Sequence, residues 1–200
     1  MGGGDRTLRR VCVFCGSNPG GRPDYAAAAR EMGRVLVERG LGLVYGGGNV
    51  GLMGIVADTV LAGGGEVVGV IPEALMAREV GHAGLTELHV VRTMHERKAM
   101  MADRADAFVA MPGGFGTFEE FCEVLTWSQL GFHPKPCGLL NVAGYYDPLL
   151  ALFDRGAEEG FIPPQHRALV IEETDPARLL DRFAAFRPPT TSKWIRPDER

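Results

Sequence analysis

Short apolar runs alternate along this chain with longer segments whose apolar residues recur at helical spacing. Runs such as 41–45 and 67–71 are almost continuously apolar, which is typical of parallel strands buried on both faces. The pattern predicts strands at 9–15, 41–45, 66–71, 87–91, 106–111, 137–142 and 167–171. It predicts helices at 23–39, 50–63, 94–104, 117–130, 147–159 and 175–185. This alternation indicates a single-domain α/β, Rossmann-like, doubly wound sandwich with a parallel sheet of about seven strands.

No internal repeat and no linker-like stretch interrupts the alternation. We therefore predict one Rossmann-like domain over residues 9–186, with a flexible N-terminal arm at 1–8 and a C-terminal tail at 187–200. Residues 72–86 fall between two predicted strands and lack a clear period. An irregular or partly helical insert of this length is typical of a lid.

The composition is that of an ordinary globular protein. Of the 200 residues, 46% are hydrophobic and 23% are charged, which excludes extensive disorder. The formal net charge of −4 disfavours a broad nucleic-acid-binding surface. No apolar run reaches membrane-spanning length, and the N-terminus shows no apolar core of a signal peptide. We expect a soluble cytoplasmic protein that binds neither nucleic acid nor membranes.

The four cysteines fit a reducing compartment. Cys12 and Cys15 have the spacing of a redox or zinc motif, but they lie within a predicted strand, where residues three apart point to opposite faces. We interpret them as buried structural residues. The histidines form no H-E-x-x-H motif, so we expect no metal site.

Folds of this type bind ligands beyond the carboxyl ends of their strands. The first such loop, 15–19, offers Ser17 and backbone N–H groups to an anion, although its residues also suit an ordinary turn. The second loop contains the motif G-x-G-x-x-G, with its glycines at Gly46, Gly48 and Gly51. This motif is the fingerprint of dinucleotide binding. The matching acid would be Glu73, directly after a proline, and the fingerprint follows the second strand rather than the first. The pattern therefore favours backbone capture of a phosphate or sugar over NAD binding.

The third loop carries the most specific segment of the chain, Pro112-Gly-Gly-Phe-Gly-Thr-Phe-Glu-Glu120. Its glycines let the backbone approach a ligand, and the helix that follows directs its N–H groups and positive dipole end toward an anion. The segment lacks the G-K-[ST] of a Walker motif. Thr117 and Glu120 have the spacing of a capping box, so the pattern leaves Glu120 open as a helix cap or as a catalytic residue.

Two adjacent cations, Arg97 and Lys98, fall near the first turn of the helix predicted at 94–104. The helix dipole disfavours cations there, so the pair indicates an anionic partner nearby. The alternative is a solvated helix face. Lysine is scarce in this chain, occurring only at Lys98, Lys135 and Lys193, which favours the first interpretation.

At these residues the sequence resembles the LOG ("Lonely Guy") family, the cytokinin riboside 5′-monophosphate phosphoribohydrolases. Residues 112–120 match its P-G-G-x-G-T-x-x-E motif, Arg97-Lys98 matches its Arg-Lys pair, and residues 14–18 and 45–54 also match. The resemblance extends over about residues 10–185. It implies a homodimeric enzyme that hydrolyses the N-glycosidic bond of N6-modified AMP, and possibly of plain AMP, to a free base and ribose 5-phosphate. No cofactor is implied.

Carried over by position, Arg97 and Glu120 are the expected catalytic pair. Glu79 and Thr126 occupy positions at which the family contacts its ligand, although no motif fixes them. Together, the loops and the resemblance give the expected substrate-binding residues: Ser17, Gly46, Gly47, Glu79, Arg97, Lys98, Gly113, Gly114, Phe115, Gly116, Thr117, Phe118, Glu119, Glu120 and Thr126.

Three other functions remain open from the sequence. Family members have been labelled lysine decarboxylases, and a pyridoxal phosphate enzyme would need Lys98 as its Schiff-base lysine. The same loops could serve a non-catalytic nucleotide or cofactor carrier, against which only the pairing of Arg97 with Glu120 argues. A glycosidase acting on another nucleotide would use the same residues.

Overall fold

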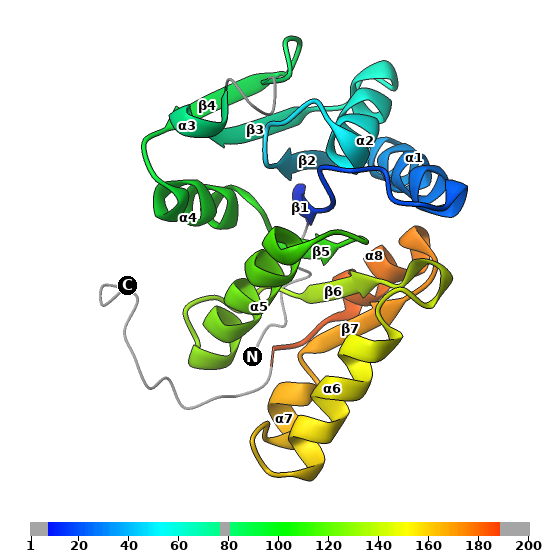
Figure 1. The fold of residues 1–200 in the computed structure, drawn as a ribbon, viewed down its shortest axis with the longest axis vertical. Helices are drawn as coiled ribbons and strands as arrows, with labels where there is room; N and C mark the ends of the chain where they lie inside the picture. The colour runs from blue at the N-terminus through cyan, green and yellow to red at the C-terminus, as the bar shows by residue number, and fades with distance from the viewer. Residues whose placement is uncertain (1–7, 77–80, 189–200) are drawn as a thin grey trace, which may run out of the picture.

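The structure is a computed structural model that describes residues 8–76 and 81–188. A seven-stranded parallel sheet carries helices on both faces (Figure 1). The strands are β1 (Arg10–Phe14), β2 (Gly42–Tyr45), β3 (Val67–Pro72), β4 (Glu87–Val91), β5 (Ala107–Ala110), β6 (Cys137–Leu140) and β7 (Val170–Glu173). The helices are α1 (Pro23–Glu38), α2 (Gly51–Ala62), α3 (Glu73–Met76), α4 (Met94–Arg104), α5 (Phe115–Leu130), η1 (Val142–Gly144), α6 (Asp147–Glu158), α7 (Pro164–Arg167) and α8 (Pro176–Ala185). The predicted doubly wound α/β fold is confirmed.

The strand order is β4-β3-β2-β1-β5-β6-β7. The chain winds from β1 outward to β4, then returns to the other side of β1 and winds outward again from β5. β1 and β5 are therefore neighbours, with Val11 opposite Ala107 and Phe14 opposite Ala110. Because the connections after these two strands leave in opposite directions, they open a crevice at the carboxyl edge of the sheet, where folds of this type bind ligands.

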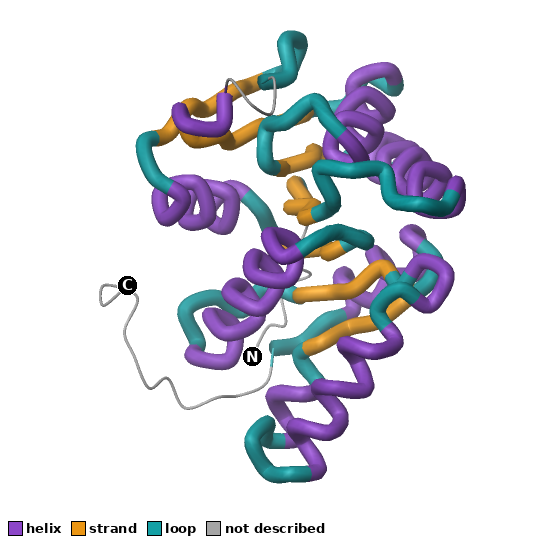
Figure 2. The backbone as a smooth tube through the Cα atoms, viewed as in Figure 1, coloured by secondary structure: helices purple, strands orange, loops and turns teal. Residues whose placement is uncertain are grey.

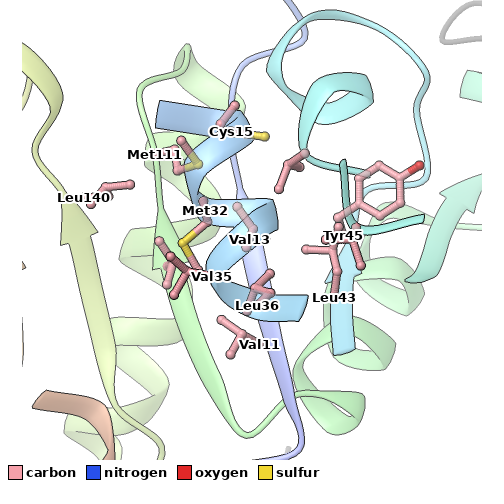
Figure 3. Close-up of a cluster of buried hydrophobic side chains, with 14 of the residues drawn as sticks. Val11, Val13, Cys15, Met32, Val35, Leu36, Leu43, Tyr45, Met111 and Leu140 are labelled. Atoms are coloured by element: carbon pink, nitrogen blue, oxygen red, sulfur yellow. The ribbon is translucent and has the colours of Figure 1, made fainter. Parts of the chain in front are cut away.

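Two apolar layers enclose the sheet. α1, α2 and α8 cover one face, and α4, α5 and α6 cover the other (Figure 1). Figure 3 shows the first layer, in which Met32 and Leu36 of α1 lie against Val11 and Val13 of β1. Most strands are buried on both sides because their residues meet one layer or the other, which explains their continuously apolar sequences. The edge strand β4 is the exception, because most of its residues are only half-buried and Val90 is exposed.

The alternation along β1 decides the environment of its cysteines. Cys15 lies in the layer beneath α1, whereas Cys12 lies in the opposite layer, as predicted. All four cysteines are free. Burial in apolar surroundings raises the pKa of the Cys12 and Cys15 thiols well above its usual range. These thiols are therefore structural residues rather than a reactive pair.

The structure differs from the predicted element boundaries at the start of β7 and at the start of α5. β7 begins at Val170 rather than at residue 167, because two consecutive prolines, Pro163 and Pro164, start the short helix α7 instead. α5 begins at Phe115, two residues before the predicted start. The 72–86 insert contains α3 and an isolated bridge between Gly48 and Gly81, while residues 77–80 lie outside the described part. No helix in the described ranges is long and apolar enough to cross a membrane.

Candidate active site

Three loops meet at the switch point, after β1, β2 and β5 (Figure 2). The Gly16 N–H donates to the Pro112 carbonyl at 3.0 Å, and the Leu52 N–H donates to the Gly16 carbonyl at 2.9 Å. Gly51 has a φ of +58° and lies so close to the backbone of Ser17 that a Cβ would collide with it. Glycine at this position therefore lets the second loop dock on the first.

The glycine loop, residues 112–116, delivers the chain into α5. Gly114 is the N-cap and makes no side-chain cap bond, so the first N–H groups of the helix have no acceptor within it. A Cβ at Gly114 or Gly116 would meet open space, which means that a ligand can approach this backbone. Free N–H groups and the positive end of the helix dipole make this terminus an anion site.

The early start of α5 removes the capping-box interpretation of Glu120. Thr117 lies inside the first turn of the helix rather than at its N-cap, and its hydroxyl lies against Gly113. Glu120 therefore occupies the second turn, beyond the reach of a capping box. Of the two roles that the sequence left open for Glu120, the cap is wrong.

Glu120 instead faces Arg97, which projects from the first turn of α4. One terminal nitrogen of Arg97 lies 3.6 Å from Glu120 Oε1. The Arg97 Nε donates to the Val70 carbonyl at 3.1 Å, and the other terminal nitrogen donates to the Gly46 carbonyl at 3.2 Å. The two residues are only 6% and 9% exposed. The guanidinium is thus held in one orientation by β3 and by the loop after β2, with one edge toward the carboxylate.

The position of the Arg97 guanidinium requires a glycine at residue 46. A side chain there would occupy the space of the Arg97 guanidinium. The first glycine of the apparent dinucleotide fingerprint therefore admits an arginine from another element rather than a pyrophosphate. Gly47 has a φ of +78° and packs against Ile71, which continues the same close approach.

Lys98 has a different environment from its neighbour. Its Nζ lies 2.5 Å from a Glu119 carboxylate oxygen and 3.0 Å from one of Glu123, so it links α4 to α5. Burial by itself would lower the pKa of Lys98, but the hydrogen bonds and charges of Glu119 and Glu123 outweigh it and the pKa is raised. Lys98 and Glu119 therefore neutralise each other beside the site.

A recess of about 280 Å³ opens next to the glycine loop. Its walls are residues 16–20 after β1, residues 112–114, and the side chains of Tyr25, Leu52 and Tyr145. Ser17, one of the expected substrate-binding residues, belongs to this wall. Sequence reasoning did not single out Tyr25 or Tyr145. The one signal for Tyr145 was its place in a Gly-Tyr-Tyr-Asp segment just after a predicted strand.

The remaining predicted residues are Phe115 and Phe118 near the start of α5, Thr126 farther along α5, and Glu79. Phe115 is 91% exposed at the start of α5, and Phe118 is half-buried against Tyr145 one turn later. Thr126 lies in the second half of α5, where it donates to the Cys122 carbonyl and borders a separate recess of about 160 Å³ between α5, α6 and α7. The structure does not bring Thr126 to the glycine loop. Glu79 lies outside the described residues.

A larger hollow of about 900 Å³ lies at the opposite, amino edge of the sheet. Its polar side chains are mostly engaged with each other: Arg10 pairs with Glu66 at 2.6 Å, and the Asp106 carboxylate accepts from the backbone N–H groups of Arg9 and Arg10. None of the predicted site residues borders it. Size alone therefore does not identify the functional site.

The arrangement provides an amide-lined anion site, with a buried carboxylate and guanidinium on the adjoining elements. It does not provide a Schiff-base lysine among the described residues. Lys98 is paired with two carboxylates, and the Lys135 Nζ donates to the Ala102 carbonyl at 2.6 Å. No group of three or more His, Cys, Asp or Glu side chains in the described ranges could hold a metal ion.

Comparison with known proteins places these features in context. A family model described as "Possible lysine decarboxylase" matches residues 53–183. A rice (Oryza sativa subsp. japonica) protein named "Probable cytokinin riboside 5′-monophosphate phosphoribohydrolase LOGL1" is 56% identical over 177 residues, covering 88% of this chain and 79% of its own length. An Arabidopsis thaliana protein named "Cytokinin riboside 5′-monophosphate phosphoribohydrolase LOG7" is 51% identical over 181 residues, covering 90% of this chain and 83% of its own length.

Among solved structures, the molybdenum cofactor binding protein of Rippkaea orientalis superposes with a TM-score of 0.67. The match covers 90% of this chain and 98% of that one, at 19% identity. This likeness concerns the fold, which a carrier and an enzyme can share.

Proposed function

Since this chain belongs to the LOG family, we propose that it hydrolyses the N-glycosidic bond of N6-modified adenosine 5′-monophosphates. The products are the free adenine-type base, a cytokinin, and ribose 5-phosphate. Plain AMP is a further candidate substrate. The observation that carries the proposal is the buried contact between Arg97 of α4 and Glu120 of α5, the helix that the glycine loop begins.

The proposed chemistry follows from the charges of the reaction. Cleavage of a glycosidic bond passes through a transition state in which the sugar gains oxocarbenium character, by analogy with sugar hydrolases. A carboxylate beside C1′ stabilises that positive charge and can activate the attacking water. We assign this role to Glu120. Arg97, held by two backbone carbonyls, keeps Glu120 in position and orients the substrate.

The phosphate takes no part in bond breaking, so the protein needs only to hold it. The open N–H groups at the start of α5 and the recess beside them offer such a place. Binding energy from this remote group can position the ribose against Glu120, and part of it should then appear in kcat.

The proposed enzyme is a cytoplasmic homodimer. Its four free cysteines fit a reducing compartment. Leu152 and Phe161 are 63% and 85% exposed on α6 and the turn after it. Exposed apolar side chains of this size suit a surface that a second copy covers.

The proposal is tested by incubating the protein with N6-isopentenyl-AMP, AMP and isopentenyladenosine and measuring free base by chromatography. Each charge-assisted hydrogen bond contributes roughly 1.5–3 kcal/mol, and the loss of two or three should lower kcat/KM for the nucleoside by about 10²–10⁴-fold. Equal kcat/KM for nucleoside and nucleotide would contradict the phosphate site. Tight nucleotide binding without release of base would favour a carrier.

A further inference from the structure

The connection from β6 to α6 is a rigidly held segment that no motif of the sequence analysis included. Ala143 has a φ of +52°, the one non-glycine residue with positive φ in the described ranges. The Asn141 side chain accepts from the Tyr146 N–H at 2.8 Å and donates to Asp147 at 2.7 Å and to Glu172 at 2.9 Å. A segment with this backbone conformation and these bonds has a fixed shape, so the side chains that it carries are fixed as well.

Two tyrosines of this segment bind the glycine loop and the residue directly before it. The Tyr146 hydroxyl donates to the Met111 carbonyl at 2.6 Å, and the Tyr145 hydroxyl donates to the Gly113 carbonyl. The carbonyl between these, that of Pro112, accepts from the Gly16 N–H at 3.0 Å. Three consecutive carbonyls thus each accept a hydrogen bond, two from adjacent tyrosines of the β6–α6 connection and one from the loop after β1.

The bonds to the Pro112 and Gly113 carbonyls decide where two of the loop N–H groups point. A trans peptide unit is planar, and its N–H points opposite to its carbonyl. Fixing the carbonyl of Gly113 therefore fixes the N–H of Gly114, the N-cap of α5. Glycine has no conformational preference that would do so by itself, and ordering it costs more entropy than ordering any other residue. The orientation of the amide donors depends on external bonds.

We propose that Tyr145 is a positioning residue, whose hydroxyl orients the Gly114 amide of the glycine loop to bind the 5′-phosphate of the substrate. This inference rests on the proposed function for the identity of the ligand. Tyr145 is the half-buried member of the pair and borders the recess beside the loop, whereas Tyr146 is fully buried.

The Tyr145 ring is held independently of its hydroxyl. It makes an edge contact with Tyr25 at a centroid distance of 5.8 Å and with Tyr146 at 5.1 Å, and it stacks on Phe118 at 6.4 Å. Tyr145→Phe therefore keeps these contacts and removes only the bond to Gly113. The matched control is Tyr45→Phe, because the buried Tyr45 hydroxyl has no hydrogen-bond partner in the described part of the chain.

The test measures binding of ribose 5-phosphate by calorimetry, and kinetics with N6-isopentenyl-AMP and isopentenyladenosine. Tyr145→Phe should weaken ribose 5-phosphate binding and raise KM for the nucleotide, each by about tenfold, with a smaller loss in kcat. Hydrolysis of the nucleoside should stay at the level of the unmodified protein. Tyr45→Phe should change none of these quantities.

Two results would overturn the inference: unchanged ribose 5-phosphate affinity in Tyr145→Phe, or an equal loss with nucleoside and nucleotide. The second would indicate a general structural role. If the unmodified protein binds ribose 5-phosphate but releases no base from the nucleotide, the proposed function fails. The calorimetric comparison still decides the role of Tyr145 in that case.

Discussion

At the scale of single residues, the site depends on a charged pair that little water reaches. Arg97 makes bonds to two backbone carbonyls as well as its contact with Glu120, so its position does not depend on the carboxylate alone. Glu120 can therefore interact with a substrate without Arg97 being released from its place.

Glu120→Gln should fold and lose most of its activity. Glutamine keeps the volume of the side chain but lacks the negative charge that stabilises an oxocarbenium-like sugar, so turnover should fall by roughly 10²-fold or more. Loss of one charge from a buried pair also costs stability, so turnover is measured where circular dichroism shows the variant folded. Turnover close to that of the unmodified protein would leave Glu120 with a structural role only.

Arg97→Lys should be impaired to a similar degree. An ammonium group cannot reach the Val70 carbonyl, the Gly46 carbonyl and Glu120 with the fixed geometry of a guanidinium. Misplacement of a site residue by about 1 Å costs on the order of 10²-fold in rate. The measurement is kcat/KM with N6-isopentenyl-AMP. Retained activity in this variant, together with lost activity on substitution of Lys98, would mean that the roles of the two cations are reversed.

At the scale of elements, α4 and α5 meet beside the glycine loop, and Lys98 links them through Glu119 and Glu123. Arg97 and Lys98 are neighbours in sequence, yet one faces the site and the other faces a helix. A helix turns about 100° per residue, so adjacent side chains diverge. The adjacent cations therefore serve two functions, one in the site and one in packing.

Lys98→Met should reduce stability more than catalysis. Methionine keeps much of the aliphatic stem and removes the two ion pairs, which are partly exposed and contribute about 1 kcal/mol at most. In a protein of this size that corresponds to a fall in Tm of about 2–4 °C, and kcat should stay within about threefold. A loss of activity as large as that of Arg97→Lys would contradict this assignment.

The ion pairs of Lys98 with Glu119 and Glu123 also predict how the stability of the protein depends on pH. The folded-state pKa of Lys98 is raised, so its contribution is complete below the pKa of the unfolded chain and is lost only as pH rises through the higher folded value. The difference in Tm between Lys98→Met and the unmodified protein should therefore be constant between about pH 7 and pH 9. A difference that disappears within that range would mean that Lys98 is neutral there and free to act as a nucleophile.

At the scale of the whole molecule, the amino edge of the sheet holds the larger hollow, whereas the carboxyl edge holds the motif residues. Helix N-termini gather at the carboxyl edge because each helix follows a parallel strand. The fold therefore concentrates free N–H groups at one end, and that end suits a phosphorylated substrate.

The proposed homodimer predicts a mass near twice the chain mass of 21.6 kDa in light scattering at micromolar concentration. Leu152→Glu should shift the protein toward the monomer if the surface of α6 is the interface, because a charge there would be buried without a partner. Val90→Glu introduces the same charge at another exposed apolar position, on β4, so it serves as the control and should leave the mass unchanged. A single-chain mass for the unmodified protein would contradict the dimer.

The sequence by itself determined the elements, the class of fold and most of the residues at the switch point. Apolar runs and helical periods are local signals, and a β-α-β alternation admits few arrangements once crossovers are right-handed. The glycine loop was visible because only glycine tolerates a ligand or another backbone at such close range. Ser17 and the pairing of Arg97 with Glu120 were also within reach of motif reasoning.

Only the tertiary structure decided which partners these residues have. Arg97 is held by carbonyls 27 and 51 residues away in the chain, and the Gly113 carbonyl by a tyrosine 32 residues later. The recess that Thr126 borders, between α5, α6 and α7, likewise depends on contacts that no local pattern encodes. Hydrogen bonds between distant segments form only after the sheet has set the strand order, so sequence spacing carries no record of them.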